Sequence, residues 1–242
     1  MSALKIESLT KKYPGGTLAV DGISLDVADG ESVAVFGLER SGKSTLLRMI
    51  AGLEDVTQGR ILFDGKDVTD APTKERNVAF AFQGVNLDQQ ASVYENLAYG
   101  LKLRKVPAAV IDVKVRAVAQ ILGLSSELMR KPKTLTAEKR RLVVFGRTIV
   151  RDPKAYLFDD ALSGLDESLR ESTLRALVGL QIRLNATFLY ATDDIREAVS
   201  IGSRVAILRE GKLVQIDTPE RLFAAPADDF VAEIMGAARK GE

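Results

Sequence analysis

The sequence has no cysteine, no histidine and no tryptophan among its 242 residues. Without cysteine there is no disulfide framework, no thiol nucleophile and no zinc-thiolate site. Without histidine the chain lacks the commonest general base and the commonest metal ligand. Function classes that depend on these groups are therefore excluded, and the lack of cysteine fits a reducing compartment.

An excess of charge of either sign is also missing, because 34 Lys and Arg stand against 33 Asp and Glu, for a formal net charge of +1. Such a balance gives no global attraction to nucleic acid or to a membrane surface, and we expect no nucleic-acid partner. The longest apolar runs, such as Leu142–Phe145 and Ala155–Phe158, fall far short of the roughly 20 residues that span a bilayer. The N-terminus does not resemble a signal peptide. We expect a soluble chain, or one held at a membrane by partners.

Short apolar runs bounded by Gly, Asp or Pro alternate with segments of helical period, which is typical of a mostly parallel sheet covered by helices. The pattern predicts an α/β fold. Between Gln83 and Arg151 the strand signal is weak and amphipathic segments predict inserted helices. Two short helices are predicted after Thr218, and a frayed tail over 237–242. Strands are predicted at about 3–8, 20–27, 32–36, 59–63, 78–82, 155–159, 186–191, 204–209 and 212–216, and further helices at about 43–52, 107–123, 137–151, 167–184 and 193–200.

One glycine-rich motif is specific. The residues from Gly37 to Ser44 form a complete G-x-x-x-x-G-K-[ST] pattern between a predicted strand and a predicted helix. In such a loop the backbone amides and the helix N-terminus face the β- and γ-phosphates of a nucleotide, the lysine neutralises charge and the hydroxyl ligates Mg²⁺. A structural glycine turn is the alternative, and the strand-loop-helix setting argues against it. Phosphate binding is assigned to Gly37, Leu38, Glu39, Arg40, Ser41, Gly42, Lys43, Ser44 and Thr45.

The second half of a phosphate site is an acid that ends a buried strand. The apolar run Ala155–Phe158 is followed by Asp159, which is placed to hold Mg²⁺ through water. An apolar run that ends in Asp is weak evidence for a metal site on its own, but together with the glycine-rich loop it is good evidence. Ser44 and Asp159 are therefore predicted metal ligands.

Further motifs follow in a fixed order: Val78–Gln83, Ser92–Leu101, Pro132–Arg141, Leu162–Asp166 and Tyr190–Asp194. With these motifs, nearly the whole chain resembles the ATP-binding subunit of an ABC transporter, in particular of carbohydrate and polyol importers. The resemblance implies a P-loop NTPase fold of the ABC type. This fold has a mostly parallel sheet, an N-terminal antiparallel β portion and a helical subdomain at about 84–151. It implies ATP and Mg²⁺ as ligands.

The resemblance also assigns roles to single residues. Tyr13 lies where the family stacks an aromatic ring on adenine, although a surface tyrosine on a hairpin is the alternative. Gln83 matches the glutamine that approaches Mg²⁺ and the attacking water. Ser92–Leu101 is similar to the segment that receives a coupling helix of the membrane subunit. The signature-like segment comprises Leu135, Thr136, Ala137, Glu138 and Lys139, and the D-loop comprises Ser163, Gly164, Leu165 and Asp166.

Two replacements alter the chemistry that the resemblance implies. Asp160 stands in place of a catalytic Glu, and a carboxylate withdrawn by about 1 Å can cost on the order of 10²-fold in rate. Asp193 replaces a histidine that contacts the γ-phosphate. A carboxylate at this place is repelled by phosphate, because two like charges 4 Å apart repel each other by about 4 kcal/mol at an effective dielectric near 20. Asp193 must therefore turn away, pair with a cation or weaken closure on the nucleotide; a helix cap before Ile195 is the alternative.

The signature-like segment departs from the family as well, because Ala137 and Glu138 replace two glycines whose amides approach phosphate. A carboxylate at this helix N-terminus competes for the place of the partner's γ-phosphate, and the cations Lys139, Arg140 and Arg141 offer only a partial offset. We predict weak or absent turnover by this chain.

Three functions remain open. The first is a degenerate ATP-binding half of a bacterial importer's motor, working with transmembrane permease subunits, a second and more competent ATP-binding subunit and, indirectly, a solute-binding protein. The others are a non-hydrolytic ATP-binding scaffold and a slow homodimer in which Asp160 suffices as the acid. The resemblance places the protein in the cytoplasm, on the inner face of the plasma membrane through its permeases. We expect a single ATP-binding domain over 1–242 without the C-terminal β-rich regulatory domain of such importers.

Overall fold

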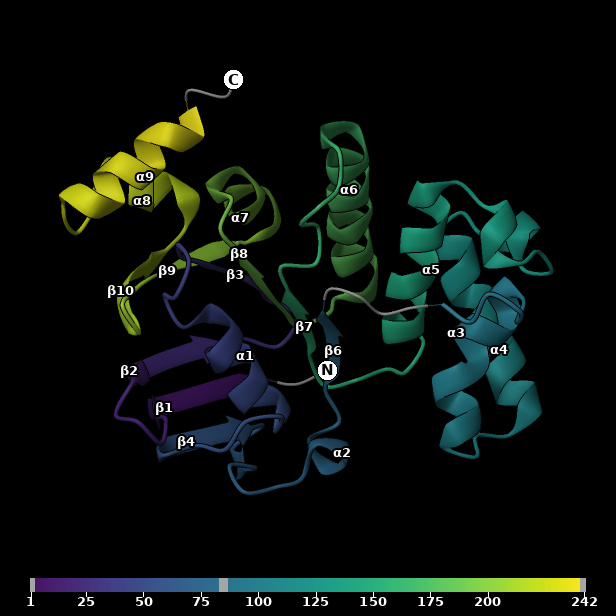
Figure 1. The fold of residues 1–242 in the computed structure, drawn as a ribbon, viewed down its shortest axis with the longest axis horizontal. Coiled ribbons are helices and arrows are strands. Elements are labelled where there is room, and N and C mark those ends of the chain that lie inside the picture. The colour runs from purple at the N-terminus through teal and green to yellow at the C-terminus, as the bar shows by residue number, and fades with distance from the viewer. Residues whose placement is uncertain (1–2, 83–86, 240–242) are drawn as a thin grey trace.

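The computed structural model describes residues 3–82 and 87–239, which form alternating strands and helices (Figure 1). Two short 3-10 helices, Ser125–Glu127 and Pro132–Thr134, precede the α-helix Ala137–Ile149. The strands are β1 (Leu4–Lys12), β2 (Leu18–Val27), β3 (Ser32–Phe36), β4 (Gln58–Phe63), β5 (Lys66–Asp67), β6 (Ala79–Phe82), β7 (Tyr156–Asp159), β8 (Phe188–Thr192), β9 (Arg204–Arg209) and β10 (Lys212–Asp217). The α-helices are α1 (Lys43–Ala51), α2 (Thr73–Arg76), α3 (Val93–Leu103), α4 (Ala108–Ile121), α5 (Ala137–Ile149), α6 (Glu167–Leu184), α7 (Ile195–Ile201), α8 (Pro219–Ala224) and α9 (Asp229–Arg239).

The larger sheet has the strand order β10-β9-β3-β8-β7-β6. Neighbours from β9 to β6 run parallel, and only the edge strand β10 pairs antiparallel, with β9. β3, β7 and β8 are buried along their whole length, as expected of parallel strands with helices on both faces. The predicted α/β fold with a mostly parallel sheet is confirmed.

A second, antiparallel sheet has the order β2-β1-β4-β5, and it confirms the predicted N-terminal antiparallel portion. Helix α1 lies between the two sheets in Figure 1, and its apolar residues share one core cluster with both of them. Alternate residues of β3, Val33 and Val35, face this cluster, whereas Ala34 and Phe36 face the opposite one. The helix that follows the glycine-rich loop is thus held on two sides.

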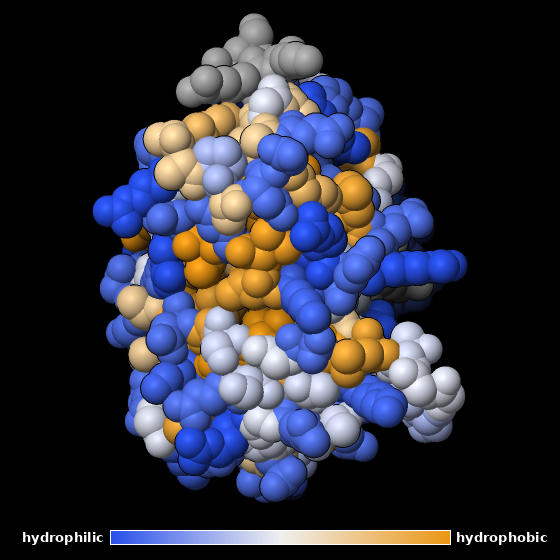
Figure 2. Space-filling view, turned by 90° about the vertical axis from the view of Figure 1, so that its left-hand side faces the viewer, coloured by the Kyte–Doolittle hydropathy of each residue, from blue (hydrophilic) through white to orange (hydrophobic). Residues whose placement is uncertain are grey.

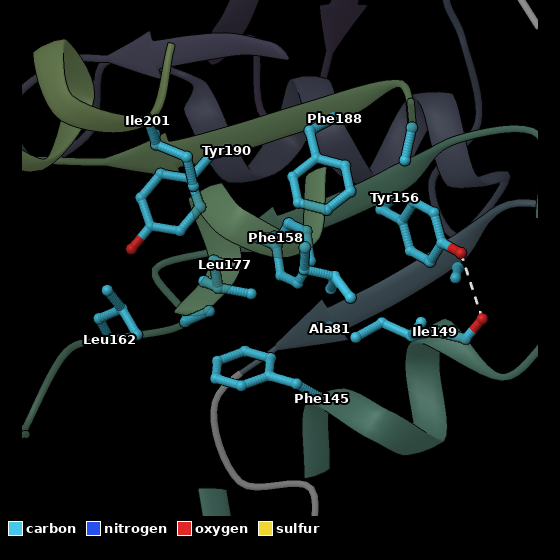
Figure 3. Close-up of a cluster of buried hydrophobic side chains, with 14 of the residues drawn as sticks. Ala81, Phe145, Ile149, Tyr156, Phe158, Leu162, Leu177, Phe188, Tyr190 and Ile201 are labelled. Atoms are coloured by element: carbon cyan, nitrogen blue, oxygen red, sulfur yellow. Dashed lines mark hydrogen bonds between the residues drawn. The ribbon is translucent and has the colours of Figure 1, made fainter. Parts of the chain in front are cut away.

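Aromatic rings fill the opposite face of the larger sheet (Figure 3). The ring centroids of Tyr156 and Phe188 lie 5.2 Å apart, and those of Phe158 and Phe188 lie 5.0 Å apart. The Tyr156 hydroxyl donates a hydrogen bond of 3.2 Å to the carbonyl of Ile149, so α5 is tied to β7. Because side chains alternate along a strand, packing of Tyr156 and Phe158 on this face directs Asp159 to the α1 side.

Helices α3, α4 and α5 pack against one another and stand at the right-hand end of the molecule in Figure 1. Gly146 of α5 allows the close approach of α3, since a Cβ there would lie 2.4 Å from Leu97. The inserted helices predicted between Gln83 and Arg151 are therefore present in the described part of that stretch.

Several predicted boundaries are wrong. β1 continues to Lys12 instead of ending near residue 8, because it pairs on one side with β2 and on the other with β4. The helix predicted at 193–200 begins at Ile195. Helix α3 was not among the predicted helices, although Ser92 and Glu95 form a capping box at its start. The frayed tail was placed too early, since α9 continues through Arg239 and is anchored by Val231 and Met235.

Figure 2 shows the side of the molecule that carries β10, α8 and α9, with an apolar area at mid-height among charged residues. β10 is an edge strand, and Leu213, Val214 and Ile216 are half-buried in it. Lys212 at its start pairs with Asp21 at 3.3 Å. Among the residues that the structure describes, no helix has the length and apolar character needed to cross a membrane.

Arg76 stabilises the end of α1 from inside the protein. It is 3% exposed, and its guanidinium donates hydrogen bonds to the carbonyls of Met49 and Ile50 and, from the other side, to those of Thr69 and Ala71. The Ile50 carbonyl belongs to the last turn of α1, where helix carbonyls lack intrahelical partners, and the Met49 carbonyl also accepts from the amide of Gly52 at 3.1 Å.

We expect Arg76→Met to lower the free energy of unfolding by about 2–4 kcal/mol, because it removes the guanidinium donors of the Ile50, Thr69 and Ala71 carbonyls and one of the two donors of the Met49 carbonyl. Urea denaturation of the wild type and the variant measures this difference. Arg48→Met is the matched control, since Arg48 is exposed on the same helix. An Arg76 variant as stable as the control would contradict the assigned role.

Candidate functional site

The glycine-rich loop connects β3 to α1, as the sequence predicts, and its glycines are required by space. A Cβ on Gly37 would lie 2.4 Å from the Ser41 hydroxyl, and one on Gly42 would lie 2.4 Å from the carbonyl of Ala19. Gly42 has φ 99° and precedes α1 without a side-chain cap. The amides of the first turn of α1 are therefore left for a ligand, in a geometry that favours an anion.

The other residues of the loop divide by exposure. Leu38, Glu39 and Arg40 are exposed, and Arg40 adopts φ 61°. Ser41 is buried, and its hydroxyl has no hydrogen-bond partner among the described residues. The exposed part of the loop thus carries its two charged residues of opposite sign, Glu39 and Arg40.

Lys43 folds back over the loop. Its ammonium donates to the carbonyl of Gly37, and to that of Leu38 at 3.1 Å. Burial lowers the pKa of Lys43, and the charges of Asp193 and Asp160 act in the opposite direction. The lysine is held where a phosphate group would meet it, with acidic side chains as its electrostatic neighbours.

Ser44 and Asp159 come together from positions 115 residues apart, and the Ser44 hydroxyl donates a hydrogen bond of 2.7 Å to Asp159. Asp159 is 7% exposed at the end of β7, while Ser44 and Thr45 are half-buried in the first turn of α1. A hydroxyl and a carboxylate in contact form an oxygen donor pair of the kind Mg²⁺ prefers. These residues fit a bound Mg²⁺.

Asp160 follows directly, with φ 50°, and its amide donates to the carbonyl of Ala191 at 3.0 Å. Burial, and next the charge of Asp193, raise the pKa of Asp160, while a hydrogen bond with Ser163 opposes the shift. Asp160, Asp193 and Lys43 thus form one electrostatic cluster at the phosphate loop. A γ-phosphate here would meet two carboxylates.

The alternative in which Asp193 caps the following helix is wrong. Asp194 is the cap, because its carboxylate accepts from the amide of Arg196 at 2.8 Å. Asp193 is exposed and interacts electrostatically with Lys43 and Asp160.

Asp160→Asn should stabilise the protein at neutral pH. A carboxyl whose pKa is raised in the fold binds its proton more tightly when native than when unfolded, so its ionised form reduces stability as pH rises above the ordinary value of 3.8. The difference in Tm between the variant and the wild type should be positive at pH 7 and shrink toward pH 4. Thermal unfolding across this range measures it, with Asp70→Asn as an exposed control; a difference independent of pH would contradict the account.

The signature-like segment begins α5. Thr136 caps the helix by accepting from the amide of Lys139 at 3.3 Å, and Glu138 is exposed in the first turn. The Lys139 ammonium is held by the buried carboxylate of Glu127, and Arg140 donates to the carbonyl of Leu135 at 2.6 Å. Both cations have partners within the chain. Glu138 is therefore the exposed charged residue of the helix N-terminus, next to the exposed Ala137.

The remaining predicted residues are placed as follows. Tyr13 is half-buried in the turn between β1 and β2, with the Lys11 ammonium 5.1 Å from its ring centroid. Gln83 lies outside the described residues. In the D-loop, Ser163 and Gly164 are exposed, and Asp166 caps α6 by accepting from the amide of Leu169 at 3.0 Å.

The roles of three residues next to the site, Thr192, Glu197 and Arg170, were not predicted from the sequence. The carbonyl of Thr192 accepts from the amide of Gly37 at 3.3 Å, and the Thr192 hydroxyl donates to Glu197 at 2.7 Å. Arg170 lies 3.6 Å from Glu197 across α6 and α7. In the sequence these residues look like ordinary polar residues of a strand and two helices. Thr192 and Glu197 are buried and Arg170 is partly buried, and their contacts are visible only in the tertiary structure.

An uncapped helix N-terminus after a glycine-rich loop, with its Ser44 paired to the Asp159 that ends another parallel strand of the same sheet, defines a P-loop nucleotide-binding domain. The family model described as ABC transporter matches residues 20–163. The chain belongs to the ABC transporter family, as the resemblance indicated.

Curated relatives match almost the whole chain. The sn-glycerol-3-phosphate import ATP-binding protein UgpC of Bordetella avium is 44% identical over 237 residues, which cover 98% of this chain and 66% of the relative. The diacetylchitobiose uptake system ATP-binding protein MsiK of Streptomyces coelicolor is 44% identical over 238 residues, covering 98% of this chain and 63% of the relative. The chain thus spans slightly less than two thirds of the length of these relatives.

Solved structures agree on the fold. The protein cbiO1 from Clostridium perfringens, part of the ABC transporter complex cbiONQ, superposes with a TM-score of 0.84 at 28% identity, covering 93% of this chain and 91% of that one. A nucleotide-free ATP-binding cassette from an ABC transporter gives a TM-score of 0.82 at 25% identity, covering 97% and 98%. The P-loop NTPase fold of the ABC type is confirmed.

Proposed function

We propose that the protein is an ATP-binding motor subunit of a bacterial ABC importer that takes up a sugar, a polyol or a related solute such as a glycerol phosphate. The names of the 44% identical relatives, a glycerol phosphate importer subunit and a diacetylchitobiose uptake subunit, support this solute class. The site supports ATP as the ligand. Lys43 and the first turn of α1 bind the phosphates, and Ser44 with Asp159 holds Mg²⁺, which shields phosphate charge when bound.

The surface of α3 and α5 supports a permease as the partner. Two neighbouring cavities of about 410 and 360 Å³ share Tyr99 and Arg147 in their walls. Tyr99 is 51% exposed and Leu103 67% exposed, which is unusual for large apolar side chains and typical of a contact surface. The helical subdomain of about 84–151 offers this surface to a permease, which holds the protein at the inner face of the plasma membrane. A solute-binding protein takes part only indirectly.

Intrinsic turnover by this chain is weak under this proposal. The observation that carries it is the gathering of Asp160 and Asp193 at Lys43. Asp160 is a methylene shorter than the Glu of the family, and Asp193 brings negative charge to the γ-phosphate side. A second ATP-binding subunit with intact motifs supplies the competent chemistry, and this chain is the impaired half of the motor.

Affinity purification tests the partners. The tagged chain is recovered from native membranes in mild detergent with Mg²⁺ and ATP, and the proteins that elute with it are identified by mass spectrometry. We expect two kinds of partner, permeases and a second ATP-binding subunit. Tyr99→Asp should remove the permeases, whereas Ile182→Asp, on an exposed apolar residue of α6, should retain them.

The other outcomes decide against parts of the proposal. Permeases with this chain alone would overturn the second subunit and leave a homodimeric motor. Recovery of no membrane partner from membranes that contain the protein would overturn the importer function and favour a scaffold that uses ATP as a structural ligand.

A further inference from the structure

A cavity of about 540 Å³ separates the start of α6 from α7. Arg170 and Glu197 line it together with Arg175 and Arg196, whose side chains are more exposed. The side chain of Arg170 is 26% exposed and that of Glu197 only 8%. A charged pair in such a position must have a structural or functional reason, since desolvation opposes it.

Arg170 connects three segments. Its guanidinium donates to the carbonyl of Leu165, in the D-loop, at 3.3 Å. It lies 3.8 Å from the carboxylate of Asp194 and 3.6 Å from that of Glu197. The Nε atom of Arg170 is buried and makes no hydrogen bond, so the geometry with Glu197 is electrostatic and leaves room for adjustment.

Glu197 connects Arg170 to β8. Its second carboxylate oxygen accepts from the hydroxyl of Tyr190 at 2.9 Å and from that of Thr192 at 2.7 Å. With two hydrogen bonds on one oxygen and the arginine near the other, the carboxylate is fixed in orientation.

Thr192 brings the chain of contacts to the phosphate loop. Its carbonyl accepts from the amide of Gly37 at 3.3 Å, and its hydroxyl accepts from the amide of Asp194 at 3.1 Å. Asp193 lies between these two anchored residues. A continuous path therefore runs from the D-loop carbonyl through Arg170, Glu197 and Thr192 to the first residue of the phosphate loop.

We propose that Arg170 and Glu197 are positioning residues that couple the D-loop, Ser163–Asp166, to the segment Thr192–Asp194 and to the phosphate loop. Neither touches the nucleotide. Binding of a nucleotide at Gly37–Thr45 orders Thr192–Asp194, and the Arg170–Glu197 pair transmits that order to the D-loop. The inference rests on the proposed function, because it takes ATP as the ligand of the phosphate loop.

Amide hydrogen exchange of the purified full chain, with and without Mg²⁺ and ATP, tests the coupling. In the wild type, ATP should slow exchange at the phosphate loop, at Thr192–Asp194 and at the D-loop. In Arg170→Gln, ATP should still slow exchange at the first two, while the slowing at the D-loop falls by about 5-fold or more. ATP affinity should stay within about 3-fold of the wild type, since Arg170 makes no contact with the phosphate loop.

Matched variants distinguish a positioning role of Arg170 from a general contribution of Arg170 to the stability of the fold. Arg175→Gln removes an exposed ion pair with Glu171 on the same helix and in the same cavity, and it should behave like the wild type. Arg170→Lys should restore part of the protection of the D-loop. Glu197→Gln keeps an oxygen for Tyr190 and Thr192 while removing the charge that faces Arg170, and it serves if Arg170→Gln does not fold.

The outcomes are distinguishable. A wild type that binds no ATP would contradict the proposed function. A wild type that binds ATP, with D-loop protection unchanged in Arg170→Gln and in Glu197→Gln, would overturn the positioning role alone. A general loss of protection and of Tm, with the response of the D-loop to ATP preserved, would also overturn it.

Discussion

Lys43→Ala should weaken the binding of ATP by at least about 30-fold. The Lys43 side chain is half-buried over the phosphate loop, where its ammonium donates to the carbonyl of Leu38 at 3.1 Å, whereas Arg40, the other cation of the motif, is exposed. Loss of one partner of a buried charge pair costs about 2–5 kcal/mol, and 1.4 kcal/mol corresponds to a factor of ten in affinity. Displacement of a fluorescent ATP analogue from the purified protein measures the change.

The control for this variant is Lys66→Ala, because Lys66 is exposed in β5 and belongs to the smaller sheet. It should bind ATP like the wild type. The Lys43 variant should keep the Tm of the wild type in the absence of nucleotide, or exceed it, since burial disfavours the charge of Lys43. Equal affinity in the two variants would mean that ATP binds elsewhere.

Asp160→Glu combined with Asp193→His should raise ATP turnover by about 10²-fold, whereas Asp160→Glu alone should raise it less than about 3-fold. The single variant extends the carboxylate but leaves the negative charge of Asp193 at Lys43 and Asp160. The double variant replaces that charge with an imidazole, which donates a hydrogen bond to phosphate. Release of phosphate from saturating ATP gives the rates.

Adding Lys43→Ala to the double variant provides the control, because it should abolish the gain if turnover occurs at the phosphate loop. Asp160→Glu with the full activity of the double variant would show that Asp193 does not limit the site. The proposal of an impaired half-motor would then fail.

The phosphate loop was predictable from sequence because the residues that form it are consecutive in the chain. The loop from Gly37 to Ser44 has glycines at the two places where a Cβ would collide with neighbouring atoms. The pairing of Ser44 with Asp159 could also be anticipated. The carboxyl ends of parallel strands lie at one edge of a sheet, and the strand ending in Asp159 belongs to that sheet.

The long-range part was not predictable. Asp193 and Asp194 are identical in type, and only the backbone geometry of the turn decides that Asp194 caps α7 while Asp193 is exposed and acts electrostatically on Lys43. Arg170 and Glu197 looked like ordinary polar residues of amphipathic helices, and their contact depends on how α6 and α7 pack. The pairing of β1 with both β2 and β4, which lengthens β1, likewise depends on sheet order.

The fate of bound ATP tests the account most directly. The purified wild-type chain is loaded with radiolabelled ATP and Mg²⁺, freed of unbound nucleotide, and sampled over time for bound ATP and ADP. We predict close to one nucleotide bound per chain, abolished by Lys43→Ala and recovered mainly as ATP over many minutes. Rapid conversion to ADP by the wild type alone would contradict the claim that Asp160 and Asp193 impair this site.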